Sequence, residues 1–123
     1  MSLLSAIARM EGFGVQGSRA RRNNNPGNIE WGSFAAQHGA TGREPDLAHS
    51  KGRFAVFPSA DIGFVALKQL LLEHYATLTV EAAILKYAPP SENDSESYIR
   101  NICNWAQCKP TDIIKDVLQS EGV

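Results

Sequence analysis

The stretch Ile7–Ile29, IARMEGFGVQGSRARRNNNPGNI, decides the fold, because an apolar helix here gives way to a segment rich in glycine, arginine and asparagine. Apolar residues recur at helical spacing up to this point: Leu3, Leu4, Ile7, Ala8 and Met10. They predict a first helix over residues 2–11, with Gly12 near its C-terminal cap. Glu11 therefore falls in the last turn, where the partial negative charge of the helix end disfavours an ionised carboxylate.

Glu11 is the candidate catalytic residue of this stretch. A glutamate on a helix is ordinarily a solvated surface residue. Here Met10 and Phe13 are apolar neighbours that can desolvate it, and desolvation and the helix end both favour the neutral form that a general acid needs. Gly12 and Gly14 let the chain leave the helix sharply. A local rule that is broken without structural gain points to a functional site.

The segment that follows, residues 12–53, is predicted to be mostly irregular. It holds most of the glycines and few apolar residues, and a long irregular segment in a compact domain is usually functional or disordered. NIEW (residues 28–31) and RFAVF (residues 53–57) are its strand-like pieces, so any sheet is small. Arg19, Arg21 and Arg22 form a basic cluster that reads as a solvated loop, or as a site of attraction to an anionic wall polymer.

Helical patterns dominate after Pro58. Ser59 is a plausible N-cap of a helix that runs to about Tyr75, and its apolar face is formed by Ile62, Val65, Ala66, Leu70 and Leu72. A shorter helix opens at Thr79 and stops at Pro89-Pro90. Ser95 is expected to cap the next helix, which is lined by Tyr98, Ile99, Ile102 and Trp105, and Thr111 is expected to cap the last, Asp112 to about Gln119.

These patterns predict one mainly helical α+β domain over residues 1–123. It has an N-terminal helix, a small polar loop-and-hairpin lobe and a C-terminal helical bundle. The chain has 123 residues, 43% of them hydrophobic and 20% charged, which suits one domain with a sizeable core.

The charge distribution gives no sign of a nucleic-acid binder, because the formal net charge is −1. Residues 1–58 carry seven Arg or Lys against four acids, and this weak excess suits an anionic polymer such as a cell wall. No stretch approaches the roughly 20 apolar residues of a membrane span. The opening MSLLSAIARM lacks the basic region of a secretory signal, so we expect a protein made in the cytoplasm that reaches an outside target by another route.

Metal or cofactor chemistry is not expected from the sequence. His38, His49 and His74 are scattered and match no metal-ligand spacing. Cys103 and Cys108 are five residues apart, and two helical residues so spaced face different directions. We therefore expect reduced thiols rather than a disulfide.

Four blocks in order resemble the phage-type lytic transglycosylases and muramidases of the lysozyme-like superfamily. They are IARMEGFG, RRNNNPGNIEWG, GRFAVFPSADIGFVALKQLL and ILKYAPPSENDSESYI, and the resemblance covers roughly residues 5–105. It implies a lysozyme-like fold that acts, without a cofactor and as a monomer, on the glycan strand of peptidoglycan. Glu11 would then protonate the oxygen of the β-1,4 bond between N-acetylmuramic acid and N-acetylglucosamine.

A second carboxylate would decide the chemistry. A two-acid hydrolase sets its carboxyl groups about 5–5.5 Å apart for retention or about 6.5–9.5 Å for inversion. A lytic transglycosylase needs one acid, because the substrate N-acetyl group attacks the anomeric carbon and the muramyl 6-hydroxyl then gives a 1,6-anhydro product. Glu30 is the best partner candidate, although it also reads as a solvated strand residue. Glu44 and Asp46 flank Pro45 and read as solvated loop residues.

The resemblance also suggests substrate-binding residues. Asn28 would orient the N-acetyl group or a bound water, although NNNPGNI also reads as a well-made turn in which asparagines adopt left-handed conformations. Tyr87 matches a cleft tyrosine. In the cellular transglycosylases an asparagine directly follows this tyrosine, whereas in this chain APPSEN follows it. Asn93, at the end of that block, is the candidate to replace the missing asparagine.

Aromatic residues near positions 54–57 and at position 98 could serve either in substrate binding or in core packing. Phe54 and Phe57 either stack on sugar rings or pack in the core, and Ser59, next to them, is both a helix cap and a substrate-binding candidate. Tyr98, at helical spacing with Ile102 and Trp105, reads as a core residue.

Two classes of function remain open on the sequence alone. The chain is either an enzyme or a module of the same fold that binds peptidoglycan or a partner protein without chemistry. An endolysin released through holes in the inner membrane, a virion-associated lysin and a secreted effector would all act on the wall from the periplasm with a sequence of this kind.

Overall fold

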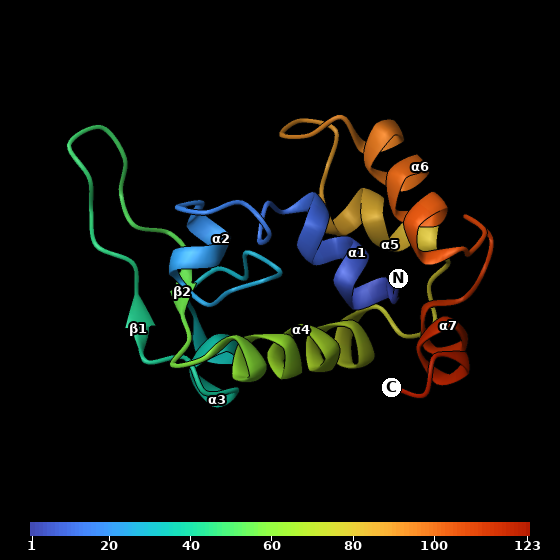
Figure 1. Cartoon of the computed structure of the whole chain (residues 1–123), viewed down its shortest axis with the longest axis horizontal. Coiled ribbons are helices and arrows are strands. Elements are labelled where there is room, and N and C mark those ends of the chain that lie inside the picture. The colour runs from blue at the N-terminus through green and yellow to red at the C-terminus, as the bar shows by residue number, and fades with distance from the viewer. The chain divides into compact units, whose positions relative to one another are not determined.

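The computed structural model describes residues 1–123 and divides into two compact units. One unit combines Met1–Met10 with Gln69–Val123, and the other is Glu11–Lys68. Helices predominate and one small antiparallel sheet is present, so the mainly helical α+β class is confirmed (Figure 1). The single domain expected from chain length stays a prediction.

The first unit is built of helices around an aliphatic core. Its elements are α1 (Leu3–Met10), the second part of α4 (Ala60–His74), α5 (Val80–Tyr87), α6 (Ser95–Ala106) and α7 (Ile114–Ser120). Both α1 and α5 pack against α6. Side chains that are almost fully buried form the core: Leu3, Ile7, Leu71, Val80, Ile84, Tyr98, Ile102, Ile114 and Leu118.

Two of the predicted helix caps are confirmed. The Thr79 hydroxyl accepts a hydrogen bond from the Ala82 N–H at 3.1 Å, and the Ser59 hydroxyl accepts one from the Ile62 N–H at 3.3 Å. Each bond satisfies a backbone donor that the first turn of a helix leaves without an internal partner.

The other two caps were predicted wrongly. Asp94, and not Ser95, caps α6, since its carboxylate accepts from the Ser97 N–H at 3.1 Å. Ser95 is buried and donates its hydroxyl to the Ala88 carbonyl at 2.6 Å, so its side chain fastens the preceding loop instead. The last helix, α7, follows Ile113 without any side-chain cap; backbone pairing with Thr79 sets its start in place of Thr111.

The second unit, Glu11–Lys68, holds the predicted polar lobe. It contains α2 (Arg19–Arg22), α3 (Ser33–Gln37), β1 (Gly42–Arg43), β2 (Ala55–Val56) and the first part of α4. The strands pair antiparallel with Gly42 opposite Val56, so RFAVF does supply a strand. NIEW does not: it contributes one isolated bridge, Glu30 to Phe54. The arginine cluster is a short helix capped by Ser18, and not a loop.

The predicted apolar face of α4 is wrong in part. Ile62, Val65 and Leu72 are 38%, 56% and 36% exposed, whereas the buried hydrophobic side chains of α4 are Ala66, Leu67 and Leu71. The reason is close packing on small residues. A Cβ at Gly63 would lie 2.0 Å from the Asn24 carbonyl oxygen, so the helix backbone lies directly on the asparagine turn. None of the helices has the length and apolar character needed to cross a bilayer.

Candidate active site

Glu11 comes directly after α1 and is held by Asn28. The Asn28 side-chain amide donates to Glu11 Oε1 at 3.1 Å and to the Glu11 backbone carbonyl at 3.3 Å. The second bond serves a carbonyl of the kind that a helix C-terminus leaves without an internal donor. One amide group therefore fixes both the backbone and the carboxyl group of the candidate acid. Glu11 itself is half-buried.

The backbone on both sides of this contact is unusual. Gly12 has a φ of +85° and follows Glu11, as the predicted helix cap requires. Asn28 is left-handed with a φ of +48°, a conformation that asparagine tolerates better than most residues. Its Oδ1 atom is buried without a hydrogen bond from the protein. Unsatisfied buried acceptors are rare in folded proteins and call for an explanation.

The other asparagines of NNNPGNI build the turn that carries Asn28. Asn25 is fully buried, donates to the Ile29 and Ala55 carbonyls at 2.9 Å each, and accepts from the Ile29 N–H. Asn24 donates to the Phe57 carbonyl at 3.1 Å. The block is thus the well-made turn that one reading of the sequence expected, with Asn28 as the member that reaches Glu11.

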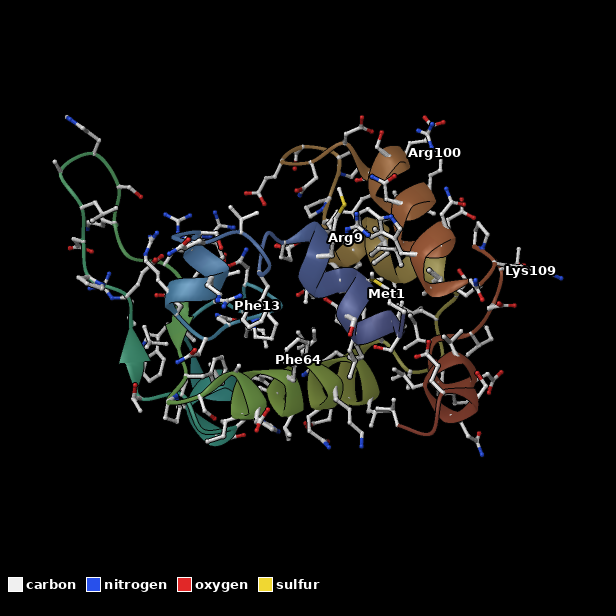
Figure 2. The ribbon with its side chains drawn as sticks, in the orientation of Figure 1. Met1, Arg9, Phe13, Phe64, Arg100 and Lys109 are labelled. Atoms are coloured by element: carbon white, nitrogen blue, oxygen red, sulfur yellow. The ribbon has the colours of Figure 1, made fainter.

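Phe13, one of the two residues expected to shield Glu11, lies in an aromatic contact. Its ring meets Phe64 edge to face with centroids 5.4 Å apart, and the Arg21 guanidinium lies 5.7 Å from its centroid. Figure 2 shows the side chains of Phe13 and Phe64 next to each other. The contact ties the segment after Glu11 to α4. Met10 belongs to the other unit, where its sulfur accepts from the Asn101 amide at 3.8 Å.

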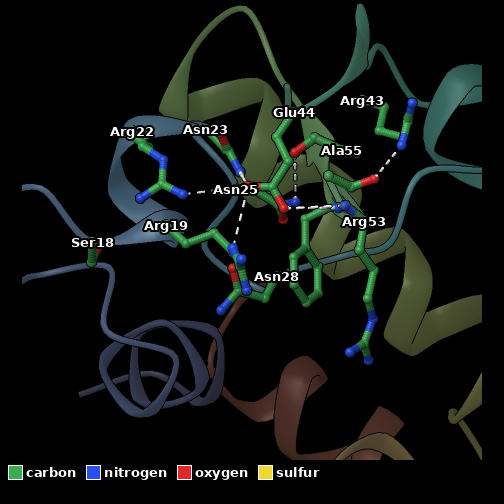
Figure 3. Close-up of polar contacts among 12 residues, drawn as sticks. Ser18, Arg19, Arg22, Asn23, Asn25, Asn28, Arg43, Glu44, Arg53 and Ala55 are labelled. Carbon is green, nitrogen blue, oxygen red and sulfur yellow. Dashed lines mark hydrogen bonds and ion pairs between the residues drawn. The ribbon is translucent and has the colours of Figure 1, made fainter. Parts of the chain in front are cut away.

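Glu44 is not the solvated loop residue that the sequence suggested, since it is only 3% exposed. Its carboxylate accepts from the Asn23 amide and from the backbone N–H groups of Arg53 and Phe54, each at 3.2 Å. Arg19 and Arg22 also approach Oε1, at 3.2 and 3.5 Å (Figure 3). The Arg19 Nε contact is an ion pair without hydrogen-bond alignment.

This surrounding sets the ionisation of Glu44. Burial by itself raises the pKa of the carboxyl, but the hydrogen bonds from Asn23, Arg53 and Phe54 and the charge of Arg19 outweigh it, so the pKa lies below the ordinary value. Glu44 is therefore an anion that joins α2 to the hairpin. Its role in the structure is that of a buried structural carboxylate.

The remaining candidates for a second acid are also paired. Glu30 forms an ion pair with the Arg53 guanidinium at the surface. Asp46 accepts from Arg43 at 3.2 Å and from the Gly52 N–H at 2.8 Å. Both carboxylates are more than half exposed, and both serve the hairpin.

The aromatic and hydroxyl candidates of this unit fall into different environments. Phe57 is 1% exposed and lies in the core, so the packing alternative holds and sugar stacking does not. Two guanidinium groups lie over the ring of Phe54, that of Arg19 4.9 Å and that of Arg53 5.0 Å from its centroid. The Ser59 hydroxyl serves the N-terminus of α4.

Tyr87 and Asn93 belong to the other unit, Met1–Met10 with Gln69–Val123. Tyr87 ends α5 and meets Tyr75 edge to face with centroids 6.0 Å apart. Asn93 is exposed and lines an open pocket of about 400 Å³, together with Glu81, Leu85, Pro90, Asp94, Ser95, Glu96 and Ile99. Tyr98 is 2% exposed, as the core prediction required.

Two features of this lobe were not predicted from the sequence. Glu44 was expected to be solvated, although three arginines within residues 19–22 were a signal that an acid elsewhere in the lobe would pair with them. The contact of Asn28 with Glu11 was not expected, because no local pattern connects residues that are 17 positions apart.

No family model matches the chain. The chain is 33% identical over 92 residues to Protein P5 of Pseudoalteromonas phage PM2, in a match that takes in 72% of this chain. The chain spans about half of that relative, since the match covers 56% of its length. The similarity therefore connects the chain with a phage protein.

Proposed function

We propose that the chain is a peptidoglycan lytic transglycosylase of lysozyme-like fold with Glu11 as its catalytic acid. The observation that carries the proposal is the double hydrogen bond from Asn28 to Glu11. Catalysis by one carboxyl depends on its orientation toward the scissile oxygen, and a side-chain donor that holds Oε1 directs the other carboxyl oxygen. The similarity to a phage protein supports a phage origin, and hence an endolysin or a virion-associated lysin.

In the proposed reaction Glu11 acts first as an acid and then as a base. Its carboxyl proton passes to the glycosidic oxygen as the bond between N-acetylmuramic acid and N-acetylglucosamine breaks. The carbonyl oxygen of the muramyl N-acetyl group bonds to the anomeric carbon. The Glu11 carboxylate then takes the proton of the muramyl 6-hydroxyl, whose oxygen displaces the acetamido oxygen and forms the 1,6-anhydro ring. The steps consume no water and return Glu11 protonated.

The surroundings of the other acids favour one catalytic carboxylate over two. Glu44 is buried among five donors or cations, while Glu30 and Asp46 are each paired with an arginine. A two-acid muramidase, the second candidate, would require Glu30 to leave Arg53 and face the substrate. A binding module without chemistry has no need of a positioned Glu11.

Wall clearing tests the proposal directly. Purified peptidoglycan sacculi should lose turbidity with the wild-type chain, and Glu11→Gln should remove nearly all of that activity, since an amide cannot donate the acidic proton. If both proteins clear the walls equally, or if neither does so between about pH 4 and 8, the chain is not an enzyme with Glu11 as its catalytic acid. Sacculus binding without clearing by the wild type would instead establish the module.

Mass spectrometry of the released muropeptides separates the two enzyme readings. We expect 1,6-anhydro-muramyl ends, which are lighter by one water than the reducing ends of a hydrolase. Glu30→Gln should lower activity only modestly. Reducing ends together with a Glu30→Gln variant as inactive as Glu11→Gln would identify Glu30 as a second catalytic carboxylate.

A further inference from the structure

The C-terminal end of α6 reverses the chain and brings its two cysteines together. Gln107 ends the helix in a left-handed conformation, with a φ of 55° and a ψ of 47°. The Cys103 carbonyl accepts from the Gln107 N–H, and from the Cys108 N–H at 3.1 Å. In a helix end of this kind the side chains of the two residues at positions 103 and 108 typically touch each other.

The thiols occupy that contact. The two sulfur atoms are 3.9 Å apart, and both cysteines are free. Cys103 is 8% exposed and Cys108 is half-buried. The expectation that residues five apart face different directions assumed a continuous helix, and the reversal at Gln107 removes that assumption.

We propose that Cys103 and Cys108 are a redox pair that forms an intramolecular disulfide on reaction with a small-molecule disulfide such as oxidised glutathione. The more exposed Cys108 attacks the glutathione disulfide, which releases one reduced glutathione and leaves a mixed disulfide. The Cys103 sulfur then bonds to the Cys108 sulfur and displaces the second glutathione as its thiol. The protein loses two hydrogen atoms, and one oxidised glutathione becomes two reduced molecules.

The surroundings of the pair set the speed of this reaction. Burial raises the pKa of both thiols, that of Cys108 to about 12. The hydrogen bond from Cys108 opposes the rise of the Cys103 pKa, and the nearby acids Glu81, Asp112 and Glu121 add to the rise. Because the thiolate is the attacking species, cross-linking should be slow at neutral pH and faster as the pH rises. The pair therefore responds to sustained oxidation rather than to brief exposure.

The cross-link would act on the helix that organises its unit. It closes the last turn of α6, whose Tyr98 and Ile102 are core residues and against which α1 and α5 pack. A disulfide that the folded chain already has in contact constrains the unfolded chain more than the folded one. We expect the oxidised protein to melt several degrees above the reduced protein.

Peptide mapping under non-reducing conditions tests the proposal on the whole chain. The reduced protein is incubated with oxidised glutathione at about pH 8.5, close to the ordinary thiol pKa, then alkylated and digested with chymotrypsin. Cleavage after Trp105 separates the cysteines, so the disulfide is expected as two fragments that stay linked until reduction. Both thiols should be lost together. The Cys103→Ser and Cys108→Ser variants, as matched controls, should instead retain one glutathione adduct or one free thiol.

Three outcomes of the peptide mapping would overturn the proposal. In the first, both thiols of the wild type remain open to alkylation. In the second, the wild type ends as a stable glutathione adduct, and in the third it forms disulfides between two chains. The melting temperature of the wild type, measured oxidised and reduced, requires no variant to fold. An oxidised protein that melts no higher than the reduced one would show that the fold does not hold the pair in position.

Discussion

At the scale of single residues, the asparagines of residues 23–28 show how one amino-acid type serves different purposes. Asn25 donates and accepts within a buried turn, and Asn24 is left-handed with a φ of 51° and binds the Phe57 carbonyl. Asn28 is also left-handed but directs its amide to Glu11. The Glu11 backbone carbonyl can only accept a hydrogen bond, so the Asn28 amide nitrogen faces Glu11 and Oδ1 faces away.

A pair of glycine substitutions separates the positioning role of Asn28 from its backbone role. Glycine accepts a positive φ without strain, so Asn28→Gly keeps the turn but removes the donor to Glu11. If the proposed function holds, wall-clearing activity should fall about 10–100-fold through kcat, because the acid loses its orientation. Asn24→Gly is the matched control, with a comparable backbone and no contact with Glu11. An equal loss of activity in both variants, at equal melting temperature, would contradict a positioning role for Asn28.

At the scale of secondary-structure elements, α4 depends on the absence of a side chain at one position. A Cβ at Gly63 would lie 2.0 Å from the Asn24 oxygen and 2.7 Å from Pro26 Cδ. A backbone carbonyl and a proline ring cannot move aside for a Cβ as the end of a flexible side chain can. The backbone of α4 at Gly63 therefore packs directly against the backbone of the asparagine turn. The predicted apolar face of α4 was wrong in part for this reason, since the close approach at Gly63 directs which neighbouring positions become buried.

Gly63→Ala should therefore destabilise the protein by about 1–3 kcal/mol, the usual cost of overpacking, although alanine is the better helix former. Gly42→Ala is the control, because a Cβ at Gly42 meets nothing within 4 Å. Chemical denaturation of both variants checks the difference. A Gly63→Ala protein as stable as the wild type would show that the contact between α4 and the turn is looser than described.

At the scale of the whole molecule, titratable groups in both units set a range of pH for stability. Burial raises and hydrogen bonds lower the pKa of Glu44, with a net lowering, and the hydrogen bonds from Ser97 lower the pKa of Asp94. Their stabilising contributions are fully present above the ordinary values of 4.5 and 3.8 and are lost as pH falls through the lower folded values. The raised pKa values of the two thiols have the opposite effect. Their contribution to the stability of the reduced protein is fully present below pH 9.0 and is lost as the pH rises through the higher folded values.

We therefore expect the melting temperature of the reduced protein to fall on acidification below about pH 4.5, in the range where an unfolded glutamate gains its proton. Glu44→Gln should cost about 1–3 kcal/mol near neutral pH, where it removes charge-assisted hydrogen bonds, and should make the acid fall shallower. Glu30→Gln, at an exposed ion pair, is the control and should change neither property by much. If the melting temperatures of the wild type and of the Glu44→Gln variant fall in parallel as the pH is lowered, Glu44 is not a source of the acid dependence.

The sequence by itself determined the local features of this protein. Helical spacing placed α1, α4 and α5 within a residue or two, while Thr79, Ser59 and Gly12 marked helix ends through bonds or torsions that involve only neighbouring residues. The helix end at Glu11 was visible for the same reason. Only the tertiary structure decided that Asn28 holds Glu11, that Glu44 is buried against Arg19, and that Gly63 receives the Asn24 carbonyl. Each of these contacts joins residues far apart in the chain, so no periodicity or propensity encodes it. The cysteine pair lies between the two cases, since five residues separate the thiols but a single left-handed residue, Gln107, decides whether they meet.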